Sequence, residues 1–225
     1  MSTITVIIPA FNEEERIAGT IRAILERRRH QQLIVVDDGS TDLTPEIAAQ
    51  FPVELIKLPT NQGKAAAVTT ALRQARGEII VLLDADLGQT AKYYPRLIEP
   101  LLTGEARMAV AVLTSPKGSG GVGLVKRLAR LGMFWLTGRS FPAVLSGQRA
   151  FFKADLPKLT PLGEGFGLEF ALTVLAVRAR LAIAQVPLPM EHAYTGKDLA
   201  GYLHRYRQFQ DIFRTMVKLW KEGRR

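Results

Sequence analysis

The sequence predicts a single α/β domain with a mostly parallel β-sheet, flanking helices and an amphipathic C-terminal helix. First, its strand-like runs are rich in β-branched residues and lack polar alternation, which is typical of parallel strands covered on both faces. Second, these runs alternate with segments of helical periodicity. Third, 225 residues with 47% hydrophobic content can bury one sizeable core.

Strands and helices alternate through the first hundred residues. Residues 3–9 are the first expected strand, and Asn12 with the glutamates behind it predicts a helix with acids in its first turn. A second strand at 32–36 is followed by Thr41 or Asp42, either of which could cap a helix opened by Pro45. A third strand, a helix and a fourth strand are then expected at 53–58, 63–76 and 78–83.

The pattern loosens after residue 88, but no linker or internal repeat divides the chain. Apolar side chains recur at three- and four-residue steps through residues 198–220, which predicts the final amphipathic helix and is compatible with a homodimer contact. The other expected elements are helices at 94–102, 124–136 and 168–178, strands at 108–114, 150–153 and 182–186, and a Gly-rich loop at 117–123.

Two acids close the fourth apolar run, where a buried strand meets solvent. In a continued strand, Asp84 and Asp86 would lie on the same side of the chain and repel each other unless a proton or a cation lies between them. Mg²⁺ or Mn²⁺ suits one or two carboxylates together with substrate phosphates. Because parallel sheets bind ligands at the carboxyl ends of their strands, this pair predicts a metal–diphosphate site there.

The net charge of +9 is regional. Residues 117–139 hold five basic and no acidic side chains, and residues 196–225 hold eight basic and three acidic ones. This distribution suits a phosphorylated acceptor, an anionic membrane surface or nucleic acid, although solvated faces would look the same.

The absence of cysteine excludes disulfides and thiolate metal sites. Neither a signal peptide nor an apolar run of membrane-spanning length occurs. We therefore expect a cytoplasmic protein. The basic segments suggest that it could also associate with the cytoplasmic face of the membrane.

Five short motifs follow one another along more than half of the chain. They are Ile-Ile-Pro-Ala-Phe-Asn-Glu-Glu at 7–14, Val-Val-Asp-Asp-Gly-Ser-Thr-Asp at 35–42, Asn-Gln-Gly-Lys at 61–64, Leu-Leu-Asp-Ala-Asp-Leu at 82–87 and Ser-Gly-Gln-Arg-Ala-Phe at 146–151. In this order they resemble the signature of family 2 glycosyltransferases. The resemblance is to dolichol-phosphate mannose synthases through residue 100 and to glucosyl-3-phosphoglycerate synthases from Gly165 to His192. It implies a GT-A (Rossmann-like) fold, a UDP- or GDP-sugar donor and Mg²⁺ or Mn²⁺.

The resemblance also implies roles for single residues. Residues 1–115 would form the nucleotide-sugar-binding half and residues 116–225 the acceptor-side half. Asp84 would lie near the ribose and sugar, Asp86 would bind the metal, and His192 would complete the metal shell. The residues implied to bind substrate are Pro9, Ala10, Glu13, Asp37, Asp38, Gly63, Lys64, Asp84 and Arg149.

Glu169 is the third candidate catalytic residue, beside Asp84 and Asp86. In inverting members of the family an acid in this region acts as general base on the acceptor hydroxyl, whereas a retaining mechanism needs none and can use the acid to hold the sugar. The sequence leaves both roles open, because Phe170 stands where inverting members carry a second acid. The chain also lacks the Gln-x-x-Arg-Trp pattern of processive synthases, which argues against repeated chain extension.

The expected function is transfer of a hexose from a nucleoside-diphosphate sugar to a phosphorylated acceptor, either a polyprenyl phosphate or a small phospho-acid. One alternative is a sugar-phosphate nucleotidyltransferase, but Pro9-Ala10-Phe11-Asn12 is not the Gly-rich basic loop that such enzymes show. The other is a nucleic-acid binder suggested by the pI of 10.0. This second alternative has no recognised nucleic-acid-binding motif to support it. Acids at every strand end would repel a phosphate backbone, so we expect no nucleic-acid partner.

Overall fold

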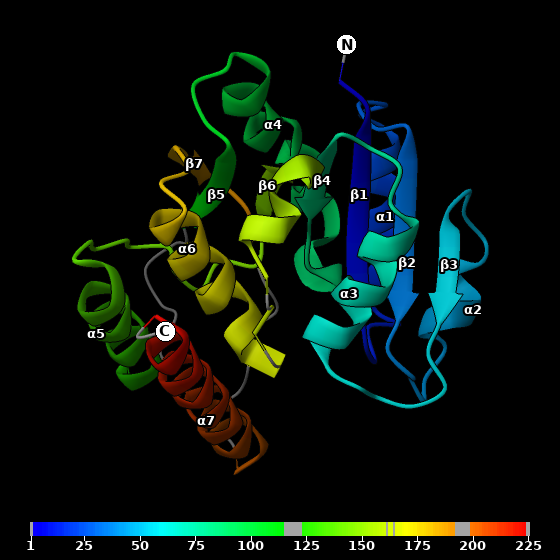
Figure 1. Ribbon diagram of the computed structural model, residues 1–225. Coiled ribbons are helices and arrows are strands. Elements are labelled where there is room, and N and C mark those ends of the chain that lie inside the picture. Colours follow the sequence, from blue (N-terminus) through cyan, green and yellow to red (C-terminus); the bar gives the residue numbers. More distant parts are fainter. Residues whose placement is uncertain (1, 115–122, 161, 164, 192–198, 224–225) are drawn as a thin grey trace.

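The computed structural model describes residues 2–114, 123–160, 162–163, 165–191 and 199–223. One seven-stranded sheet runs through the described structure, with helices on both faces (Figure 1). In the spatial order β3-β2-β1-β4-β6-β5-β7 its strands are Glu54–Lys57, Gln32–Asp37, Ile4–Ala10, Ile79–Leu82, Arg149–Phe152, Met108–Leu113 and Ile183–Leu188. The prediction of a mostly parallel sheet is confirmed.

The strand directions bring distant parts of the chain to one edge of the sheet. β1 lies parallel to β2 and β4, whereas β6 runs antiparallel to both β4 and β5. Because Leu82 at the end of β4 pairs with Arg149 at the start of β6, the residues before Arg149 lie beside those after Leu82. The carboxyl ends of β1, β2 and β4 therefore share an edge with the amino end of β6.

The sheet separates two hydrophobic clusters, as expected of strands without polar alternation. Val6 and Ile8 pack on the face covered by α1 (Ile17–Leu25), η1 (Ala85–Tyr93) and α4 (Pro95–Leu102). Ile7 packs on the opposite face, which α3 (Lys64–Gln74) and α6 (Leu168–Arg178) cover. Figure 1 shows these two layers of helices around the sheet.

Two expected helix starts are wrong. α1 begins at Ile17 and has no acid in its first turn. Residues before it form a loop instead, in which Asn12 has a positive φ of 54°. The short helix α2 spans Thr44–Ala48, so Leu43 stands at its N-cap and makes no side-chain capping bond. Asp42 bonds to Thr44 but lies one residue too early to be the cap.

A third cluster joins α6 to α5 (Leu124–Thr137) and α7 (Leu199–Glu222). Ile212 and Leu219 of α7 are buried in it, so the predicted C-terminal amphipathic helix packs partly as core. The indole rings of Trp135 and Trp220 stack with centroids 5.8 Å apart. Most of the Gly-rich loop expected at 117–123 lies outside the described residues.

Candidate active site

The loops after β1 and β2 are bonded to each other. Thr41 donates its backbone N–H to Asn12 Oδ1 at 2.9 Å, and Glu13 donates its own to Thr44 Oγ1 at 2.7 Å. Pro9 and Ala10 are the last residues of β1 and are buried against the end of β2. Glu13 is thereby held at the carboxyl edge of the sheet.

The carboxylates of Asp37 and Asp38 bind backbone groups of this edge, and both residues are buried. Asp38 accepts the N–H groups of Gln62 and Gly63, each at 2.8 Å. Asp37 accepts the N–H of Ser40 at 3.3 Å. We infer that Asp38 fixes the turn that leads into α3, which is a different task from the substrate binding that the resemblance implies for it.

Lys64, the first residue of α3, lies between two carboxylates. Its Nζ is 2.5 Å from Asp84 Oδ1 and 2.6 Å from Glu169 Oε1. Burial lowers the pKa of Lys64, but these carboxylates outweigh it and raise the pKa well above its ordinary value. Lys64 therefore remains a cation that joins the end of β4 to the start of α6.

The segment before β6 holds the other side of Asp84. Gln148 donates from Nε2 to Asp84 Oδ2 at 2.6 Å. Gly147 lies against the same carboxylate so closely that a Cβ at this position would overlap both of its oxygens. Only glycine fits there without moving Asp84.

Arg149 lies beneath the site and is fully buried. Its guanidinium donates to the backbone oxygens of Ser146 at 2.5 Å and Glu169 at 3.1 Å, while its Nε has no hydrogen-bond partner among the described residues. Burial lowers its pKa to about 10, opposed by the charges of Glu169 and Asp84. This geometry supports a positioning role for Arg149, and the structure does not bring it to a surface where it could touch substrate.

Asp86 lies in the first turn of η1, which the sequence did not predict. The argument from strand alternation is wrong, because β4 ends at Leu82 and the chain turns after Asp84. Asp86 is half-buried, and its charge is close enough to act on Glu13. Burial first, and then the charges of Asp86 and Asp84, raise the pKa of Glu13 to about 7.

The acidic side chains of this site supply carboxylate oxygens, which are the ligands that a hard divalent cation prefers. The described residues contain no group of three or more Asp, Glu, His or Cys side chains placed to hold a metal. His192, the second expected ligand, lies outside the described residues.

The match to a family model decides the class of the protein. Residues 5–146 match the model described as glycosyl transferase family 2. The chain belongs to this family. The matched segment runs from the first strand to Ser146 and includes Glu13, Lys64, Asp84 and Asp86 of the candidate site.

Solved structures extend the likeness beyond that segment. Glucosyl-3-phosphoglycerate synthase from Mycobacterium tuberculosis, crystallised with Mn²⁺, UDP and glucosyl-3-phosphoglycerate, is 28% identical with a TM-score of 0.83. The match covers 97% of this glycosyltransferase and 80% of that chain. The same synthase was also crystallised with Mg²⁺ and UDP. The predicted GT-A fold is confirmed.

Curated relatives match this chain over very different lengths. An uncharacterized protein from Methanocaldococcus jannaschii is 29% identical over 96% of this chain and 91% of its own length. A dolichol-phosphate mannosyltransferase from Pyrococcus furiosus is 32% identical over 45% of this chain, and the match covers 30% of that enzyme. An undecaprenyl-phosphate 4-deoxy-4-formamido-L-arabinose transferase from Pseudomonas aeruginosa is 35% identical, and this glycosyltransferase likewise matches only 33% of its length.

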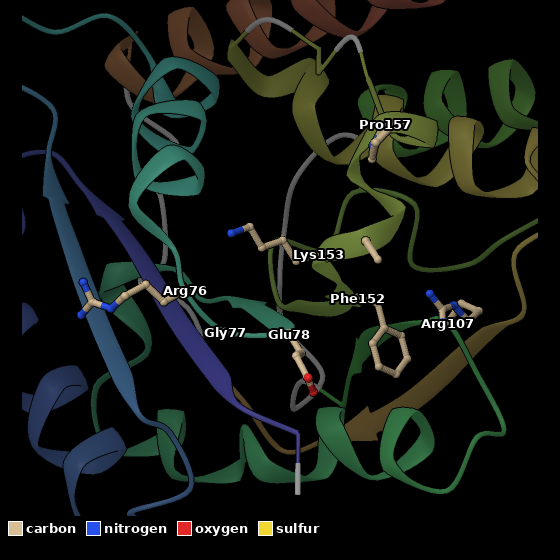
Figure 2. Close-up of a pocket in the computed structure, with 8 residues that line it drawn as sticks. Arg76, Gly77, Glu78, Arg107, Phe152, Lys153 and Pro157 are labelled. Atoms are coloured by element: carbon tan, nitrogen blue, oxygen red, sulfur yellow. The ribbon is translucent and has the colours of Figure 1, made fainter.

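A cavity of about 600 Å³ lies elsewhere in the glycosyltransferase, at the opposite ends of β4 and β6 (Figure 2). It is lined in part by Arg76, Arg107 and Lys153. Each of these cations already has a partner, namely Glu54, Asp155 and the carbonyl oxygen of Ala75 respectively. The cavity contains none of the predicted site residues, so we do not assign it to the transfer reaction.

Sequence reasoning missed two residues of the site. Gly147 and Gln148 belong to the fifth motif, but the resemblance implies no role for either. Within this motif, the resemblance assigned a substrate-binding role only to their neighbour Arg149. The signal that could have found them is the antiparallel pairing of β6 with β4, which places residues 146–148 beside Asp84.

Proposed function

We propose that this family 2 glycosyltransferase moves a hexose from a UDP- or GDP-sugar to a phosphorylated acceptor, with Mg²⁺ or Mn²⁺ as cofactor. The observation that carries the proposal is the cationic Lys64 held between Asp84 and Glu169, next to the acidic pair Glu13 and Asp86. Support for the donor and metal comes from the M. tuberculosis synthase, which was crystallised with UDP and either Mn²⁺ or Mg²⁺.

Asp86 and His192 would hold the metal ion. When bound, the ion stabilises the negative charge that develops on the diphosphate as the anomeric bond breaks. Lys64 places a second positive charge within the same site, at the head of α3. Asp84, held by Lys64 and Gln148, would orient the donor sugar and ribose.

Both proposed halves of the chain contribute to the site. Lys64 and Asp84 come from the nucleotide-sugar-binding half (1–115), and Gln148 and Glu169 from the acceptor-side half (116–225). Glu169 lies in the first turn of α6 and forms an ion pair with Lys64, which supports a role for it beside the donor site. Whether Glu169 acts as general base or holds the sugar is decided by the anomeric configuration of the product.

The acceptor class is supported by names from two kinds of relative. The M. tuberculosis synthase was crystallised with phosphoglyceric acid, whereas curated relatives are named for dolichol phosphate or undecaprenyl phosphate. No helix in the described part of this chain is both long and apolar enough to cross a bilayer. A cytoplasmic location, peripheral membrane association and a homodimer remain proposals.

The test is a panel of nucleotide sugars measured by thermal unfolding of the full chain with Mn²⁺ or Mg²⁺. Binding at 100 times Kd stabilises by about 2.7 kcal/mol, which for a domain of this size raises Tm by about 5–10 °C. We expect this shift with a UDP- or GDP-sugar, its loss in Asp86→Ala and its retention in Glu99→Ala, a matched change of an exposed acid on α4. An equal metal-dependent shift in Asp86→Ala would overturn the site assignment.

A further inference from the structure

Large exposed apolar side chains gather on two neighbouring helices. Of the ten such side chains among the described residues, seven lie on α5 or α7. We call them the α5–α7 surface: Leu124, Leu131, Phe134, Trp135, Tyr206, Phe209 and Phe213. Figure 1 shows the two helices side by side at the margin of the molecule. Such a concentration is unusual for a surface that only meets water.

On each helix these side chains form one stripe. Leu124, Leu131 and Trp135 lie seven and four residues apart, and so on the same face of α5. Leu131 and Trp135 are 68% and 57% exposed. On α7, Tyr206 and Phe213 are seven residues apart and also exposed.

The Trp135–Trp220 stack joins the two stripes, because Trp220 is seven residues after Phe213 on α7. The result is one continuous apolar surface rather than two isolated patches.

Basic side chains border this surface. On α5, Arg127 and Arg130 are exposed beside the apolar stripe, and the helix contains no acid. On α7, the exposed Arg207, Arg214 and Lys221 lie along one flank of the aromatic stripe. Apolar side chains edged by cations are the pattern of helices that lie in a membrane interface.

We propose that the α5–α7 surface docks the protein on the face of an anionic lipid bilayer, with its aromatic side chains among the headgroups and its arginines on lipid phosphates. A second copy of this chain is less well matched, because a two-fold contact through the same surface would set its own cations against each other. Anionic headgroups complement that charge, at about 1 kcal/mol per Lys or Arg near the surface.

Docking here would affect the acceptor side of the candidate site. Gly132 of α5 faces Phe170, which follows Glu169, and Gly167 before α6 packs on Thr215 of α7. A bilayer on this surface would thus lie behind the start of α6. The inference rests on the α5–α7 surface alone and holds whichever sugar is transferred.

The test is sedimentation of the full chain with vesicles of phosphatidylcholine, with and without about 30% phosphatidylglycerol, at about 0.1 M salt. We expect binding only to the anionic vesicles, and its weakening as salt is raised. Arg127→Gln/Arg130→Gln should lower the partition coefficient about thirtyfold. Arg73→Gln/Arg96→Gln removes the same charge from exposed positions on α3 and α4 and should leave binding within about twofold.

A second pair of variants tests how much the apolar side chains contribute to membrane binding. Leu131→Ser should lower the partition coefficient about fivefold to tenfold, because a side chain that enters the headgroup region is lost. Leu102→Ser makes the same change at an exposed position on α4 and should have no effect. Circular dichroism and Tm verify that each variant folds.

Two results would overturn the proposal. One is the absence of binding to anionic vesicles at about 0.1 M salt. The other is an ultracentrifugation result in which the wild type is a dimer and Leu131→Ser a monomer, since the surface would then be covered by a second copy. Neither result bears on nucleotide-sugar binding, which the thermal-shift panel measures separately.

Discussion

Replacement of Lys64 by methionine removes the cation that separates Asp84 from Glu169. Methionine keeps the length and helix propensity of lysine, so the change isolates the charge. Loss of one partner from a buried ion pair typically costs about 3–5 kcal/mol. The side chains of Lys64 and Asp84 retain 26% and 20% exposure, whereas that of Glu169 retains 9%. Because water reaches part of the pair, we reduce the expected loss to about 2–3 kcal/mol.

The measurement is urea-induced unfolding of the wild type and Lys64→Met, supported by Tm. A loss of about 2–3 kcal/mol corresponds to a fall in Tm of about 5–10 °C for a chain of this length. Lys57→Met is the matched control, because Lys57 is 54% exposed and its Nζ lies 3.9 Å from Glu46. Its effect should stay below about 0.5 kcal/mol.

A double-mutant cycle separates the ion pairs from other effects of the substitution. In a Glu169→Gln background one of the two carboxylates facing Lys64 is already neutral, so Lys64→Met should cost only about 1 kcal/mol. The coupling energy is then about 1–2 kcal/mol. If Lys64→Met is as mild as Lys57→Met, or if its effect is unchanged by Glu169→Gln, the three side chains do not form the network described above.

Three further predictions concern Gly147, Arg149 and His30, which lies before the amino end of β2. Gly147→Ala should lower the transfer rate at least tenfold by forcing the Asp84 carboxylate aside, whereas Gly123→Ala, whose added Cβ meets none of the described residues within 4 Å, should leave the rate unchanged. Arg149→Lys should destabilise by about 2–3 kcal/mol in urea unfolding, because an ammonium cannot reproduce the forked contact with two carbonyl oxygens. Burial lowers the pKa of His30 below 6.5, so the unfolded state binds a proton at a higher pH than the folded state does. The free energy of unfolding should therefore fall as pH drops below about 6.5. His30→Gln should flatten this dependence in urea titrations at several pH values.

The sequence predicted most elements of the sheet because their burial leaves a local trace. β1 is a run rich in β-branched residues and is buried at every position, and such a run fits few structures other than a buried strand. The start of α1 was mispredicted for a tertiary reason. The acids after Asn12 would suit a helix N-terminus, but the backbone there is bonded to the loop after β2, which no local pattern reveals.

Arg149 shows why a charged residue in a motif is a poor guide to its contacts. The resemblance implied a substrate-binding role for Arg149, whereas the structure buries its guanidinium against backbone oxygens. A signal was present, since period-two alternation puts Arg149 on the same side of β6 as the buried Phe151. β6 has only four residues, so that alternation could not be distinguished from chance.

The two proposed halves of the chain cannot be independent folding units. β6 belongs to the acceptor-side half, yet it lies between β4 and β5 of the other half and pairs with both. Gln148, the residue directly before this strand, donates to the carboxylate of Asp84, and Glu169 forms an ion pair with Lys64. Asp86 follows Asp84 by two residues, so the proposed metal ligand stands beside a carboxylate that both halves hold, through Lys64 and Gln148. Donor and acceptor functions would thus share one set of fixed charges, which is why we expect substitutions at Lys64 or Gly147 to disturb both at once.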